Sequence, residues 1–182
     1  KTVTVIGCGP INQSCFRHIM AQIKGIETVY CYDLFLEKAQ AVAVQADPNT
    51  VVIAADTVVA LDGVVLGKPA DKEEAFRMLS LLSGNRHQVY TGLTVLRGEQ
   101  VFSQWEETAV TFRSLTAEEI EAYIATGEPM DKAGAYGIQG YGALFIEGIS
   151  GDYYNVMGLP VCRLGQILGQ LGMDCMALAA AR

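Results

Sequence analysis

The sequence lacks a long hydrophobic run and is poor in basic residues. No apolar stretch approaches the roughly 18 residues of a membrane-spanning helix, so we expect no contact with a membrane. Thirteen Lys and Arg stand against 20 Asp and Glu, which gives a formal net charge of −7. Such a surface repels phosphate backbones and argues against general nucleic-acid binding. A small anionic ligand, held by local cations and a metal ion, is still compatible with it.

Histidine is scarce, and the cysteines lack the spacing of a metal site. The chain has two His and five Cys, an odd number with no CxxC pair. This argues against a zinc site or a disulfide framework. We interpret the cysteines as reduced and mostly buried, which predicts a cytoplasmic protein. They are Cys8, Cys15, Cys31, Cys162 and Cys175.

What the sequence has in quantity is apolar residues in short, ordered runs. With 182 residues, 51% of them hydrophobic, it suits a single domain with a sizeable core. Strand-like runs at 2–7, 28–32 and 51–55 alternate with segments of helical spacing, the βαβ pattern of α/β folds. Segments 87–96 and 100–113 indicate two long antiparallel strands. We therefore predict an α/β fold: a mixed central sheet flanked by helices, two-lobed with a cleft, opening with a Rossmann-like βαβ unit.

Three later helices carry recognisable start signals. Asp71 with Glu74, and Thr116 with Glu119, have the spacing of capping boxes. Pro160 opens the last amphipathic segment.

A glycine loop near the start has the context of a dinucleotide site. Gly7 and Gly9 lie between a strand and a helix, and Asp33 ends the next strand. Such glycines let the backbone approach a pyrophosphate, and the acid accepts from a ribose hydroxyl. Asn12 stands at the third glycine position, and the rest of the chain does not supply a Rossmann domain; a tight strand-to-helix turn is the alternative. Residues 1–33 resemble the opening of ornithine cyclodeaminase-like enzymes.

A second set of residues suggests phosphate chemistry. Asp56 follows the buried run 51–55, and open α/β sheets place ligands at the carboxyl ends of strands. A carboxylate there can hold a divalent metal or accept a proton from water. Lys38 and Lys68 supply cations, and Gln139, in a glycine-rich segment, can read a base edge. The structural alternatives are a solvated lysine, an ordinary turn and a glycine-rich turn.

Several motifs in series resemble the Maf family, with order and spacing that agree over about residues 36–182. They lie at 54–59, 66–69, 82–84, 89–92, 127–140 and 151–160. The resemblance implies an enzyme that hydrolyses nucleoside triphosphates to monophosphate and pyrophosphate with a divalent cation, Mg²⁺ or Mn²⁺. Thr57, after the acid, looks like the branch of the family that acts on dTTP and UTP.

The resemblance also assigns roles. Asp56 matches the proton acceptor, and we predict it as catalytic residue and metal ligand. Thr57 and Gln139 match positions linked to substrate choice. The predicted substrate-binding residues are Lys38, Thr57, Lys68, Asp131, Lys132 and Gln139.

One departure from the family concerns the first segment. Maf proteins begin with a strand and a Ser-x-Ser-Pro-Arg-Arg loop whose serines and arginines hold the triphosphate. Here residues 7–14 occupy that turn, with no cation before Arg17. We therefore predict a chimera, Rossmann-like over 1–35 and Maf-like over 36–182, with impaired activity. A nicotinamide-dinucleotide-binding module and an engineered, non-catalytic scaffold are the alternatives; a homodimer is compatible with either segment.

Overall fold

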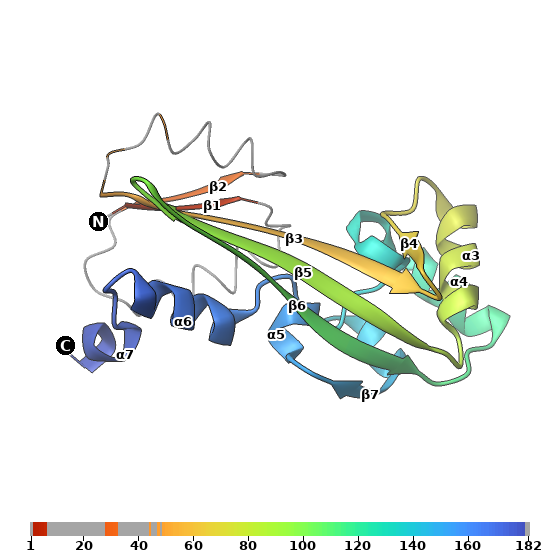
Figure 1. The fold of residues 1–182 in the computed structure, drawn as a ribbon. Coiled ribbons are helices and arrows are strands. Elements are labelled where there is room, and N and C mark those ends of the chain that lie inside the picture. The colour runs from red at the N-terminus through yellow and green to blue at the C-terminus, as the bar shows by residue number, and fades with distance from the viewer. Residues whose placement is uncertain (1, 7–27, 33–43, 45–46, 48, 181–182) are drawn as a thin grey trace. The chain divides into compact units, whose positions relative to one another are not determined.

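The computed structural model describes residues 2–6, 28–32, 44, 47 and 49–180 (Figure 1). The predicted dinucleotide residues Gly7, Gly9 and Asp33, and the predicted substrate lysine Lys38, lie outside the described residues. The chain divides into two compact units. Unit 1 comprises Lys1–Asp56, Thr91–Glu106 and Gly158–Arg182, and unit 2 comprises Thr57–Tyr90 and Glu107–Met157.

The described strands form one seven-stranded mixed sheet in the order β2-β1-β3-β5-β6-β7, with β4 paired to β3. β1 pairs in parallel with both β2 and β3, whereas β3 with β4, and β6 with β7, pair antiparallel. The strands are β1 Thr2–Ile6, β2 Thr28–Tyr32, β3 Val51–Leu61, β4 Val64–Leu66, β5 Arg86–Arg97, β6 Gln100–Phe112 and β7 Ile146–Ser150. The predicted α/β fold with a mixed central sheet and flanking helices is confirmed.

Strand β3 is longer than the sequence pattern predicted. Asp56 was expected just after the strand, but β3 continues to Leu61 because Val59, Ala60 and Leu61 pair with β4. Asp62 and Gly63, both with positive φ, form the two-residue turn between these strands. Among the described residues, the parallel pairing of β3 with β1 extends as far as Ala54. Asp56 therefore lies just beyond the last described parallel pair.

Unit 1 has its core on one face of β3 and β5. Alternate residues of β3 and β5 pack against helix α6, Val161–Gln170, which begins after Pro160 as predicted. The buried members are Val51, Ile53, Ala55, Leu93, Val95, Leu159, Leu164, Ile167, Leu168, Leu171 and Met173. A salt bridge of 2.5 Å joins Arg163 of α6 to Glu106. Helix α7, Cys175–Ala180, follows α6.

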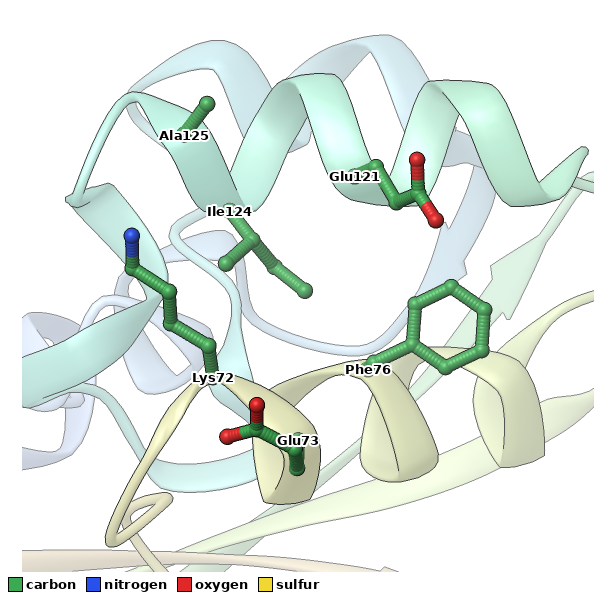
Figure 2. A pocket seen from close by; sticks show the side chains of 6 residues that line it. All are labelled: Lys72, Glu73, Phe76, Glu121, Ile124 and Ala125. Carbon is green, nitrogen blue, oxygen red and sulfur yellow. The ribbon is translucent and has the colours of Figure 1, made fainter.

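Unit 2 has its own core beneath helices α3, Lys72–Leu82, and α4, Ala117–Ala125. Thr116 and Glu119 form the predicted capping box on α4. On α3 only half of the box forms. Asp71 accepts from the amide of Glu74 at 2.8 Å, but the Glu74 carboxylate bonds to the amide of Ala70 instead of the Asp71 amide. Side chains of the two helices line an open pocket of about 460 Å³ between them (Figure 2).

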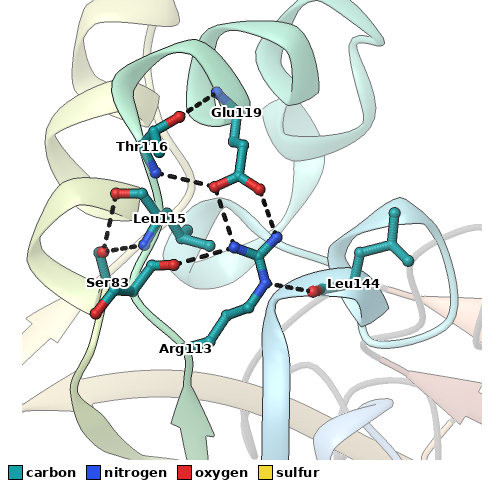
Figure 3. Close-up of polar contacts among 7 residues, drawn as sticks. Ser83, Arg113, Leu115, Thr116, Glu119 and Leu144 are labelled. Carbon is teal, nitrogen blue, oxygen red and sulfur yellow. Dashed lines mark hydrogen bonds and ion pairs between the residues drawn. The ribbon is translucent and has the colours of Figure 1, made fainter.

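Arg113, at the end of β6, connects three segments of unit 2 (Figure 3). Its guanidinium donates to both carboxylate oxygens of Glu119, at 2.7 and 3.0 Å, and to the carbonyl of Leu144 at 3.0 Å. The Glu119 carboxylate also accepts from the amide of Thr116. Bonding to Arg113 lowers the pKa of Glu119 to about 2, so this carboxylate stays charged over the physiological range. The end of β6 is thereby fixed to α4 and to the loop before β7.

A buried histidine lies in the core of unit 2. His87 of β5 is fully buried; its Nε2 is 2.9 Å from the hydroxyl of Tyr136, and its ring packs edge-on against Phe112. Nδ1 has no hydrogen-bond partner in the described part of the chain. Burial lowers the pKa of His87 from 6.5 to about 4. The ring is therefore neutral in the folded protein at pH 7.

This histidine should make the fold sensitive to mild acid. Between about pH 6.5 and 4 the unfolded chain binds a proton that the folded chain does not, so stability falls as the pH drops through this window. The shift corresponds to about 3 kcal/mol at most. His87→Gln should lose that part of the pH dependence. Urea titrations of both proteins from pH 7 to 4 measure it; parallel curves of unfolding free energy would contradict the expectation.

None of the helices in the part of the chain that the structure describes is long and apolar enough to cross a membrane.

Candidate active site

The glycine-rich segment at 127–145 folds into three short 3₁₀ helices. They are η1 Glu128–Asp131, η2 Ala133–Ala135 and η3 Tyr141–Phe145. Gly127 and Gly134 have positive φ, which a glycine adopts without strain. Gly134 also leaves no room for a side chain, because an added Cβ would lie 2.9 Å from a methyl of Val59 on β3. The segment is therefore packed directly onto the sheet.

A backbone bond joins this segment to the predicted lysine turn. The amide of Gly134 donates to the carbonyl of Gly67 at 3.0 Å, next to Lys68. Thr57 lies on β3 two residues before Val59, the residue that contacts Gly134, and so shares its face of the strand. Thr57, Lys68 and the glycine-rich segment thus belong to one unit, and the segment is fixed to the neighbourhood of both residues.

Asp131 and Lys132, two of the predicted substrate-binding residues, form an ion pair. Lys132 Nζ lies 2.5 Å from Asp131 Oδ1, with 17% of the lysine side chain and 55% of the aspartate side chain exposed. The lysine stem runs over Gly137, where an added Cβ would lie 2.8 Å from Cε. Lys132 is therefore held along the segment that leads to Gln139. Whether this pair touches substrate stays a prediction.

Three of the four remaining predicted residues are exposed. The side chains of Asp56, Lys68 and Gln139 are solvent-accessible, and Thr57 is half-buried. Asp56 is the last residue of the first segment of unit 1, whereas Lys68 and Gln139 belong to unit 2. The structure brings five predicted substrate-binding residues into unit 2. That Asp56, Lys68 and Gln139 face one cleft stays a prediction.

Asp56 fits a metal that arrives with its substrate. Among the described side chains, no group of three or more His, Cys, Asp and Glu could hold a metal alone. Mg²⁺ is commonly bound by one or two carboxylates together with substrate phosphates and water. The exposed carboxylate of Asp56, just beyond the last described parallel pair, offers such an oxygen ligand. The donor chemistry present therefore suits Mg²⁺ or Mn²⁺ bound with a triphosphate.

Two groups of structural residues were not found from the sequence. Glu128 accepts hydrogen bonds from Tyr123 and from the amides at the start of η3. Thr108 is hydrogen-bonded to both backbone groups of Asp152 and accepts from the buried Asn155, next to helix α5, Tyr153–Val156. The available sequence signals were Glu128, which precedes a cluster of glycines, and Asn155, which lies in the motif at 151–160. Apart from Tyr123, which lies 5 residues before Glu128, their partners lie 13 to 47 residues away, beyond the reach of local patterns.

These features define a class: an α/β protein that carries lysines and an amide on a glycine-rich segment and on the turn bonded to it. A family model described as Maf-like protein matches residues 13–171. The chain belongs to the Maf family.

Several relatives are close in sequence. The dTTP/UTP pyrophosphatase of Symbiobacterium thermophilum is 56% identical over 139 residues, which are 76% of this chain and 71% of that protein. The dTTP/UTP pyrophosphatase of Clostridium novyi is 47% identical over 163 residues, 88% of this chain and 85% of that protein. The dTTP/UTP pyrophosphatase of Bacillus anthracis is 50% identical over 167 residues, 87% of this chain and 86% of that protein.

Proposed function

We propose that the protein is a nucleoside triphosphate pyrophosphatase that hydrolyses dTTP and UTP to the monophosphate and pyrophosphate. The observation that carries the proposal is the 47% to 56% identity to dTTP/UTP pyrophosphatases over most of both chains. The local geometry supports it, because Thr57, Lys68 and Gln139 belong to the unit that the glycine-rich segment organises. Nucleoside triphosphates and reduced thiols are found in the cytoplasm, where we place the reaction.

Asp56 is the group that removes a proton. Its carboxylate accepts the proton from the water that attacks the α-phosphorus, and pyrophosphate leaves. Lys38 and Lys68 bind phosphate oxygens, whose negative charge grows on the leaving group. Thr57 and Gln139 contact the nucleoside. Asp131 holds Lys132 in a salt bridge on the glycine-rich segment, and Lys132 contacts the substrate from there.

A divalent cation completes the site in this proposal. When bound, Mg²⁺ or Mn²⁺ neutralises charge on the phosphates, and Asp56 is the residue that would hold it. The lysines then neutralise part of the negative charge of the phosphates that the metal does not neutralise. Binding and hydrolysis should both depend on the metal concentration.

The opening segment limits the activity in this proposal. Residues 1–35, with the dinucleotide-type loop, replace the loop that supplies arginines in Maf proteins, so charge stabilisation is reduced. The family model begins to match at residue 13, upstream of the boundary near residue 36. The origin of 1–35 as a graft therefore stays a prediction. A homodimer is compatible with this arrangement.

Dinucleotide binding is the second candidate function. The parallel pairing of β1 with β2 is what a βαβ unit requires, and it favours a Rossmann-like opening. In that case Gly7 and Gly9 would approach the pyrophosphate, and Asp33 would accept from the ribose. A non-catalytic scaffold is the remaining alternative.

One assay separates these candidates. The full chain is incubated with dTTP and Mg²⁺, and released pyrophosphate is measured with and without EDTA. We expect dTMP and pyrophosphate in equal amounts and no release with EDTA. Absence of both turnover and dTTP binding would reject the pyrophosphatase. NADH is titrated separately, and a saturable change in its fluorescence would support the dinucleotide-binding module. If neither assay gives a signal, the non-catalytic scaffold is the candidate that remains.

A further inference from the structure

Glu128 and Tyr123 together hold the two ends of the turn that carries Gln139. The Glu128 carboxylate accepts from the amides of Tyr141, at 2.9 Å, and Gly142, at 3.2 Å, on the far side of the turn. On the near side the Tyr123 hydroxyl donates to Glu128 at 2.8 Å and accepts from the amide of Gly137 at 3.1 Å. One carboxylate and one phenol therefore close a ring around residues 137–142.

The glycines of the turn are explained by this ring. A Cβ added to Gly140 would lie 2.2 Å from a carboxylate oxygen of Glu128. One added to Gly142 would lie 2.7 Å from the carbonyl of Gly137 and 2.9 Å from the Tyr123 hydroxyl. Any larger residue at either position would displace a bonded atom of the ring. The turn is therefore shaped by Glu128 and Tyr123, and its glycines provide the space they occupy.

Tyr123 is itself rigidly placed. Its side chain is 3% exposed, and its ring packs edge-on against Phe145 with centroids 5.0 Å apart. Burial, followed by the bond to Glu128, raises the pKa of the hydroxyl well above its usual value, so it remains a donor. The exposed side chain of Gln139 therefore lies on a turn whose backbone is held at both ends, at Gly137 and at Tyr141.

We propose that Glu128 is a positioning residue for nucleotide recognition: with Tyr123 it fixes the turn that presents the Gln139 amide to the base. The inference rests on the proposed function, which assigns Gln139 to the nucleoside. An amide reads a base only when its donor and acceptor are held in register with the base edge. Glu128 supplies that order without touching substrate.

The test compares Tyr123→Phe and Glu128→Gln with Glu121→Gln in the full chain. Tyr123→Phe removes the bridging hydroxyl and keeps the ring. Glu128→Gln keeps one acceptor oxygen and replaces the other with a donor. The matched control, Glu121→Gln, removes the same charge from α4, where Glu121 lines the pocket beside Phe76 (Figure 2). Initial rates are measured on dTTP and on dCTP, which has an amino donor where thymine has a carbonyl acceptor.

Both ring variants should raise KM for dTTP by about tenfold with kcat nearly unchanged, and should lower the preference for dTTP over dCTP by a similar factor. Amide hydrogen exchange should accelerate at 137–142, and Glu121→Gln should match the unmodified chain. Turnover by the unmodified chain, with unchanged KM and preference in folded ring variants, would overturn this inference alone. Absence of both turnover and binding in the unmodified chain would overturn the proposed function, and this inference with it.

Discussion

Replacing Asp56 by Asn should lower the hydrolysis of dTTP by about 10²–10⁴-fold while leaving the fold intact. An amide cannot accept the proton of the attacking water, and it is a poorer ligand for a divalent metal. Asp56 is exposed, so the substitution creates neither a cavity nor a buried unpaired group. Pyrophosphate release at saturating dTTP and Mg²⁺ gives the rate, and the urea midpoint reports the fold.

Asp62→Asn is the matched control for this prediction. Asp62 is an exposed acid in the turn after β3, and Asn tolerates its positive φ. The control changes the same charge on the same hairpin and should keep full activity. Equal rates for Asp56→Asn and the unmodified chain would show that Asp56 is neither base nor metal ligand. A loss that high Mg²⁺ restores would assign Asp56 to the metal and not to the proton.

Regular elements were predictable where one local pattern specified them. The two long strands became β5 and β6 because alternating residues face a core, as in Val89 and Leu93. Thr116 and Glu119 formed their capping box because both partners lie within one helical turn. Strand β3 was predicted too short because its first half is buried on both faces and its second half alternates. That change of pattern marks a change of pairing, from β1 to β4, and not the end of the strand.

The candidate site also contains residues that the sequence could predict and residues that it could not. Residue type and motif order predicted Lys68 and Gln139 as candidates, because charge and amide chemistry can be recognised without a structure. The role of Glu128 could not be predicted, because it bonds to backbone amides, which every residue carries. Likewise the glycine-rich segment is fixed to the lysine turn by a main-chain bond, from the amide of Gly134 to the carbonyl of Gly67. Contacts between main-chain groups distant in sequence leave no local pattern.

Activity on dTTP should be at least about 10³-fold below that of a Maf enzyme with a complete arginine loop, by analogy with the loss of a single cation in phosphoryl transfer. The strand-to-helix turn predicted at 7–14 would offer backbone N–H groups, but the sequence there holds no positively charged residue. A triphosphate carries several negative charges, and more develops on the pyrophosphate as it leaves. Restoring Ser-x-Ser-Pro-Arg-Arg should therefore raise the rate.

The restoration can be made with three substitutions. Set against residues 12–17, the motif already has its second serine as Ser14 and its last arginine as Arg17. Asn12→Ser, Cys15→Pro and Phe16→Arg complete it, and the triple variant with Phe16→Gln is the matched control without the added charge. We expect a rise in kcat/KM for dTTP that the control lacks.

The turnover rate of the unmodified chain on dTTP tests whether the opening segment impairs the enzyme. If it already turns over dTTP at about 1–10³ per second, the range typical of enzymes, the loop is not impaired and the required charge has another source. Arg17 and Lys132 are then the candidates. Arg17→Ala would abolish the activity if residues 12–17, set against the family's arginine motif, bind the triphosphate. Lys132→Ala would do so if the cation comes from the segment of Gln139, where Asp131 holds Lys132 in a salt bridge. A large loss from Arg17→Ala alone would show that the opening segment works as a Maf loop with one arginine.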